Sequence, residues 1–122
     1  MKIIIPIIAI LLFAFSGCYY DSKEFLYPEL TSCDTANITF NVCIKNIMNE
    51  SCLGCHGGSA ASGGGIKLEN YADVKLRVDD GKLIGSIKHT SGFSPMPKGA
   101  SMIESSKITI IEKWISAGAP NN

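Results

Sequence analysis

The residues with the greatest chemical potential are crowded into one pentapeptide, Cys52-Leu53-Gly54-Cys55-His56. Two thiols are separated by two residues, and an imidazole follows the second thiol directly. Thiols form disulfides, thioethers or metal bonds, and imidazole is a common metal ligand. With 5 Cys and 2 His in 122 residues, chance would produce this pattern roughly 0.003 times. The spacing therefore predicts a functional site at Cys52, Cys55 and His56.

Several kinds of site use such residues. Cys-x-x-Cys-His is the attachment signature of c-type haem, in which both thiols bond to the porphyrin and the imidazole binds the iron. A zinc site would need a fourth soft ligand, which Cys33 or Cys43 could supply. A thioredoxin-like pair needs a strand and a βαβ context that the sequence lacks. A plain disulfide between Cys52 and Cys55 would leave His56 without a role, so covalent haem is the favoured interpretation.

A haem iron bound to His56 would have a second axial position, for which the sequence offers four side chains. Met96 stands between two prolines, which fix φ and remove amide donors, so this stiff segment makes it the expected distal ligand. Met102 could instead pack at the start of the last helix, and His89 would give a bis-histidine site. Met48 lies on the attachment side, where we expect core packing. An open iron position is the remaining alternative.

The N-terminal segment is typical of an export signal. Lys2 precedes an apolar run, 3–15, that is shorter than the ~20 residues needed to cross a bilayer. Two small residues then precede Cys18, and this arrangement resembles the lipobox of bacterial lipoproteins. The resemblance implies a signal peptide over 1–17, cleavage before Cys18, and lipidation of that cysteine as a stable anchor. The alternative is an ordinary secretory signal with a free cysteine nearby.

The remaining cysteines favour a disulfide. Cys33 and Cys43 lie ten residues apart in a chain that we expect to be exported, where disulfides are permitted. Their pairing would close a small loop ahead of the pentapeptide. Two buried free thiols are the alternative.

Composition limits the class of protein. Lys+Arg and Asp+Glu both number 11, so zero net charge gives no electrostatic reason to expect nucleic-acid binding. The 46% hydrophobic content is unevenly spread, since 13 of about 56 hydrophobic residues lie in 1–17 and the rest of the chain has an ordinary share of about 41%. This argues against a protein with several membrane spans. We therefore expect a polar tether over 18–32 and one small domain over 33–122.

Helical periodicity predicts the elements that position the site. A first helix, with Asn41 as a possible N-cap, should end at the pentapeptide and bury one side: Val42, Ile44, Ile47, Met48 and Cys52. The glycine-rich segment 57–65 should be a flexible loop, and a short helix over 71–78 should direct Tyr71, Val74 and Val78 inward. A further helical turn is expected over 83–88.

The last helix has the clearest pattern. Ser105 or Ser106 should cap it, Gly118 should end it, and its apolar stripe is Ile108, Ile111 and Ile115, with Trp114 beside it. No alternating run favours a strand, so the sequence predicts an all-α domain with long loops. The hydrophobic mass is small for the size of the chain, and we expect a cofactor cavity beside Cys52 and His56.

Residues 33–119 resemble a small class I cytochrome c. The matching features are the pentapeptide after an N-terminal helix, the Ser-Pro-Met-Pro-Lys-Gly segment 94–99, and the terminal helix segment 112–120. The resemblance implies a cytochrome c-like all-α fold around one covalent haem c. It also implies thioethers at Cys52 and Cys55, with iron ligation by His56 and Met96.

With the lipobox, the chain is similar to membrane-anchored monohaem cytochromes of bacterial envelopes. This resemblance implies electron transfer rather than enzymatic catalysis. The expected partners are other envelope redox proteins, on the periplasmic or extracytoplasmic face of a membrane that holds the lipid anchor. Two alternatives remain open: a sensor or catalyst with a labile distal ligand, and a structural lipoprotein with zinc or a disulfide in place of haem.

Overall fold

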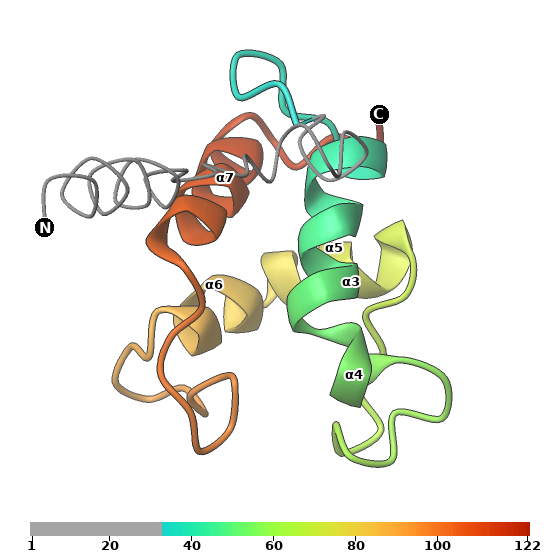
Figure 1. Cartoon of the computed structure of the whole chain (residues 1–122), viewed down its shortest axis with the longest axis vertical. Coiled ribbons are helices and arrows are strands. Elements are labelled where there is room, and N and C mark those ends of the chain that lie inside the picture. The colour runs from blue at the N-terminus through green and yellow to red at the C-terminus, as the bar shows by residue number, and fades with distance from the viewer. Residues whose placement is uncertain (1–32) are drawn as a thin grey trace, which may run out of the picture.

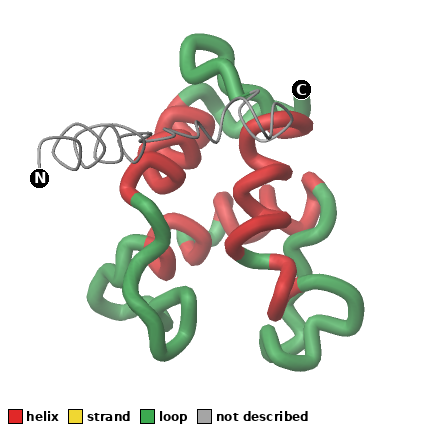
Figure 2. Tube along the Cα trace, viewed as in Figure 1, coloured by secondary structure: helices red, strands yellow, loops and turns green. Residues whose placement is uncertain are grey.

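Helices and long loops alternate along residues 33–122, the part of the chain that the computed structural model describes. The elements are η1 (Phe40–Ile44), α3 (Lys45–Ser51), α4 (Leu53–His56), α5 (Tyr71–Asp79), α6 (Lys82–Ile87) and α7 (Ser105–Ser116). Figure 2 shows helix and loop but no strand in this range, which confirms the all-α prediction. The predicted signal peptide, the tether and Cys18 lie outside the described residues. Within residues 33–122, no helix combines the length and apolarity needed to cross a bilayer.

Three aromatic side chains from separate elements form the centre of the core. The Trp114 ring of α7 is fully buried, and its centroid lies 5.7 Å from that of Phe40 in η1. The ring of Tyr71 in α5 meets Phe40 edge-on at 5.1 Å. The polar groups of Trp114 and Tyr71 are also hydrogen-bonded: Trp114 Nε1 donates to Pro120 O, and the Tyr71 hydroxyl donates to Ala119 O. This cluster joins η1, α5 and α7 into one core.

The beginning of the first helix differs from the sequence prediction. Phe40 is buried and Val42 is 38% exposed, whereas the prediction placed Val42 on the buried side. The cause is the π-helical turn η1, in which the N–H of Ile44 bonds to Thr39 O five residues earlier. This wider turn changes which side chains face the core. Asn41 does not cap the helix, which begins after Thr39, and the Asn41 N–H bonds to Asn122 O.

The predicted middle helices are confirmed as α5 and α6. Asn70 caps α5 by accepting a hydrogen bond from the Asp73 N–H at 3.0 Å. Val74 is fully buried, while Tyr71 and Val78 are half-buried against the core, as expected. The turn between the helices has Gly81 at φ +72°.

The last helix ends as predicted but begins differently. Gly118, at φ +92°, bonds to Ile115 O, and the next amide bonds to Trp114 O, which completes a Schellman motif. At the other end the N-cap is Glu104, and neither Ser105 nor Ser106 caps the helix. The Glu104 carbonyl already accepts the first helical hydrogen bonds, so both serines lie inside the first turn.

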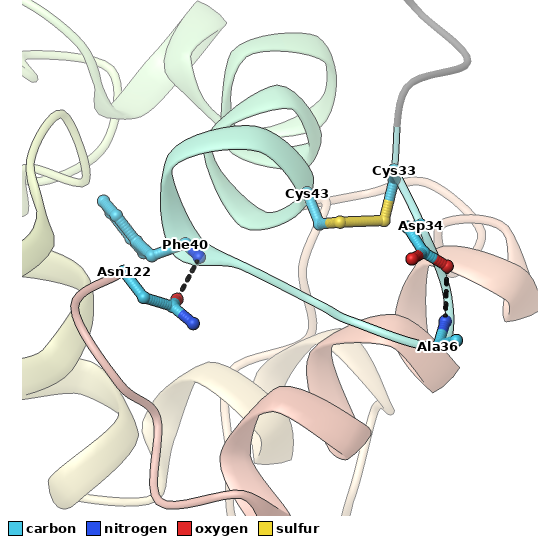
Figure 3. The surroundings of a disulfide bond; sticks show 6 residues. All are labelled: Cys33, Asp34, Ala36, Phe40, Cys43 and Asn122. Carbon is cyan, nitrogen blue, oxygen red and sulfur yellow. Dashed lines mark hydrogen bonds between the residues drawn. A yellow bond between two sulfur atoms is a disulfide. The ribbon is translucent and has the colours of Figure 1, made fainter.

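The predicted pairing of Cys33 with Cys43 is present, with an S–S distance of 2.08 Å. Figure 3 shows this disulfide joining the start of the described chain to η1, next to the C-terminal segment. There the Phe40 N–H donates to Asn122 Oδ1 at 2.9 Å. In Figure 1 this end of the domain lies at the top, whereas α4 and the loop after α6 (orange) lie at the bottom.

Candidate functional site

The pentapeptide folds into a single short turn. α4 continues α3 after a break at Cys52, whose carbonyl accepts hydrogen bonds from the N–H groups of Cys55 and His56 at 3.1 and 2.9 Å. Both cysteines are free thiols, Cys52 half-buried and Cys55 exposed. One helical turn therefore holds the three residues that the sequence singles out.

His56 is oriented by the loop that follows it. The ring is 9% exposed, and Nδ1 lies 2.8 Å from the carbonyl oxygen of Ile66. Because a carbonyl can only accept, Nδ1 carries the proton and Nε2 keeps a lone pair for a metal. Metal-binding histidines are commonly held by such a second bond. The His56 side chain is thus prepared to ligate through Nε2.

The glycine-rich loop, predicted only as flexible, packs closely on this histidine. A Cβ atom at Gly63 would lie 2.5 Å from His56 Nδ1 and 2.7 Å from the Cys55 carbonyl oxygen. The loop is also anchored, because the Gly58 N–H donates to Glu69 Oε1 at 2.8 Å. The density of glycines in 57–65 was the available signal for such a close approach.

The two thiols differ in their surroundings. Burial raises the pKa of Cys52 to about 11, and the Lys107 ammonium partly opposes this shift. Lys107 is itself held by Glu50 at 2.9 Å, which connects α7 to the end of α3 beside the site. At neutral pH the Cys52 side chain is therefore a thiol rather than the thiolate that reacts with oxidants.

The four possible distal ligands lie in very different environments. Met48 is 2% exposed and belongs to the core, as expected, whereas Met102 is 53% exposed. The Nε2 atom of His89 lies 3.0 Å from the Met96 carbonyl oxygen, to which it donates. Met96 itself is half-buried, on the loop after α6. That loop and α4 lie at the same end of the molecule, on its two sides (Figure 1).

The donor set fits haem better than zinc. Cys33 and Cys43, the two candidates for a fourth zinc ligand, are bonded to each other. Among residues 33–122, no three His, Cys, Asp or Glu side chains gather closely enough to hold a metal ion. Two free thiols and an imidazole with an available Nε2 are the groups that haem attachment requires.

The predicted cavity beside Cys52 and His56 stays a prediction, because neither residue lines the groove that the structure shows. A groove of about 350 Å³ lies instead on α6 and the loop that follows it. Its lining residues are Gly81, Ile84, Gly85, Lys88, Thr90 and Phe93. The loop that packs on His56 accounts for the low exposure of that ring.

Comparison with characterised proteins gives an independent result. Cytochrome c-551 of Bacillus subtilis (strain 168) is 31% identical to this chain over 72 residues, which are 59% of the chain and 58% of that protein. The match therefore spans little more than half of that relative. No protein-family model matches the chain, and no solved structure matches it significantly. Together with the helical fold and the Cys-x-x-Cys-His turn, this similarity supports a small c-type cytochrome.

Proposed function

We propose that this protein is a lipid-anchored monohaem c-type cytochrome that carries electrons between redox proteins of the bacterial envelope. The observation that carries the proposal is the α4 turn, with two free thiols and a histidine whose Nδ1 is bonded to Ile66 O. The similarity to a cytochrome c-551 supports the same class of protein. A bound haem would supply an iron that takes up and releases one electron.

The residues of α4 would hold this group. Cys52 and Cys55 provide the sulfur atoms for two thioethers, and His56 provides the proximal ligand through Nε2. The Ile66 carbonyl fixes the ring orientation and increases the basicity of the ligating nitrogen. The glycine-rich loop limits the access of water to the ring, which is 9% exposed.

Met96 is the proposed distal ligand. Its half-buried position and its place on a loop at the same end of the fold as α4 support this role. Two rivals are less suitable, since Met48 is in the core and Met102 is 53% exposed. His89 is bonded to the Met96 carbonyl through Nε2, the nitrogen by which His56 would bind, and keeps only Nδ1 for a metal. A methionine thioether would favour ferrous iron, and a haem held by both His56 and Met96 would have no place for a substrate, so this pair would support electron transfer.

Covalent attachment tests the proposal. Acid–acetone extraction followed by a pyridine haemochrome spectrum should leave the haem with the protein and show the spectrum of two thioethers. Cys52→Ala and Cys55→Ala should each give a spectrum with one unreacted vinyl group. Release of all haem from the wild-type protein into the solvent would overturn the assignment.

The anchor is proposed from sequence, because residues 1–32 lie outside the described residues. Removal of residues 1–17 would leave Cys18 as a lipidated N-terminus, with 18–32 as the tether. Cys18→Ser should release the protein from the membrane fraction, and mass spectrometry should find lipid on Cys18. An unmodified N-terminus at another residue would contradict the anchor while leaving the haem site unaffected.

A further inference from the structure

We infer that His89 is a positioning residue for the distal ligand, through its hydrogen bond to the backbone of Met96. This inference rests on the proposed function, because it concerns the population of molecules in which Met96 binds iron. The observation is the distance of 3.0 Å between His89 Nε2 and the Met96 carbonyl oxygen.

Both backbone polar groups of Met96 are hydrogen-bonded, one to the last turn of α6 and one to the loop residue that follows its C-cap. The Met96 N–H donates to Ser86 O at 3.0 Å, and its carbonyl accepts from His89. α6 is a firm support, because Leu83 and Ile87 are buried in the core. Two hydrogen bonds at one residue fix its peptide planes far better than one. The position of the Met96 backbone, from which its side chain extends, is therefore set by α6 and His89.

The loop between these residues is folded back on α6. The Thr90 N–H donates to Gly85 O, and the Phe93 N–H donates to Thr90 O. Gly85 permits close packing here, since a Cβ atom at this position would lie 2.6 Å from the Phe93 ring. The loop is therefore already ordered by its other contacts, so the His89 hydrogen bond to Met96 forms at a small cost in conformational entropy.

The end of α6 fixes the backbone from which the His89 side chain extends. His89 has φ +51°, in the left-handed region where glycine or asparagine is favoured. This conformation belongs to a Schellman motif that ends α6, in which the His89 N–H donates to Ser86 O and the Thr90 N–H donates to Gly85 O. Its ring donates to the one residue of the loop that we propose as an iron ligand.

Two substitutions separate the hydrogen bond from the backbone conformation. In His89→Gln the side-chain amide nitrogen can occupy the place of Nε2, so the donor is retained. In His89→Asn the left-handed backbone is better accommodated, but the shorter side chain cannot reach the Met96 carbonyl. If the hydrogen bond matters, glutamine will preserve function and asparagine will not.

The experiment uses the haem-loaded protein and measures the near-infrared sulfur-to-iron band of the ferric form and carbon monoxide binding to the ferrous form. His89→Asn should weaken the band and raise the apparent carbon monoxide affinity about fivefold, while His89→Gln stays within about twofold of wild type. Nitrogen-15 NMR of the reduced wild-type protein should place the His89 proton on Nε2.

Other outcomes overturn the inference. An asparagine variant equal to wild type removes any role for the hydrogen bond, and a glutamine variant as weak as asparagine shows that the donor is not the cause. A ring proton on Nδ1 also contradicts it. Met96→Ala serves as the reference variant. If the sulfur-to-iron band survives in Met96→Ala, Met96 is not the distal ligand, and that part of the proposed function fails. The His89 variants alone do not test the identity of the ligand.

Discussion

At the scale of single residues, two backbone carbonyls decide which ring nitrogen of each histidine is free to bind a metal. The Ile66 carbonyl accepts a hydrogen bond from Nδ1 of His56 and leaves Nε2 free, whereas the Met96 carbonyl accepts from Nε2 of His89 and leaves Nδ1 free. The sequence could identify His56 from its place after Cys55, but it could not show which ring nitrogen each histidine would leave free. That distinction depends on contacts between residues in folded loops.

Met96→Ala and Met102→Ala form a matched pair for the distal ligand. Met96→Ala should abolish the sulfur-to-iron band and lower the reduction potential by on the order of 0.1 V, because the thioether stabilises ferrous iron. Met102 is 53% exposed, so its removal should leave both quantities unchanged. Redox titration with optical detection measures the potential, and the reverse pattern would transfer the role to Met102.

Gly63→Ala should disturb the histidine side of the site. The new Cβ atom would lie 2.5 Å from His56 Nδ1, so the loop or the ring must move, at a cost of about 1–3 kcal/mol in the free energy of unfolding. Gly54→Ala is the control, because its Cβ would meet nothing within 4 Å. Urea unfolding of the haem-loaded proteins measures the difference, and equal midpoints would show that the loop does not pack on His56 as described.

At the scale of elements, local signals predicted what local geometry controls. Helices α5 and α6 follow from periodicity, and the end of α7 follows from the turn residue Gly118. The start of the first helix did not, because a π-helical turn replaced the regular period and turned Val42 outward. The sequence also did not identify Glu104 as the N-cap of α7, because three consecutive polar residues, 104–106, offer competing helix starts.

The contact between α3 and α7 beside the site should be sensitive to alkaline pH. The hydrogen bond that Lys107 donates to the Glu50 carboxylate raises the pKa of Lys107, against a smaller opposing effect of burial. Since the folded pKa lies above the ordinary value of about 10.4, the stabilisation is complete below that pH and is lost as pH rises through the folded pKa.

Lys107→Met should therefore lower the free energy of unfolding by about 0.5–1 kcal/mol at pH 7, where the ion pair is intact. The difference from wild type should be smaller at a second, alkaline pH above the folded pKa of Lys107, where the side chain has lost its charge. Lys113→Met, an exposed position on the same helix, is the control and should have little effect at either pH. Denaturant unfolding at both pH values provides the measurement; a pH-independent difference would assign the effect to packing instead.

At the scale of the whole molecule, the two ends of the domain have separate tasks. The disulfide and the C-terminal Asn122 secure η1 at one end, and α4 and the Met96 loop lie at the other (Figures 1 and 3). The sequence predicted the all-α class and the disulfide pairing from composition, spacing and export. It could not predict the position of the groove on α6, because that depends on how a long irregular loop folds back.

The disulfide should contribute to stability without affecting the haem site. It closes a loop with a sequence separation of 10, so the double variant Cys33→Ser/Cys43→Ala should lose about 2–3 kcal/mol of unfolding free energy. Alanine is chosen at position 43 because Cys43 is 2% exposed. The visible spectrum and the reduction potential should match wild type, since the bridge lies at the opposite end; a changed spectrum would show that the two ends are coupled.

The most direct test of the electron-carrier account is a carbon monoxide titration of the ferrous wild-type protein at neutral pH. With His56 and Met96 both bound to iron, no axial position is free, so the spectrum should remain unchanged while Met96→Ala binds the gas readily. Ready binding by the wild-type protein would contradict the account, because an open or labile position belongs to a sensor or a catalyst rather than to a carrier of single electrons.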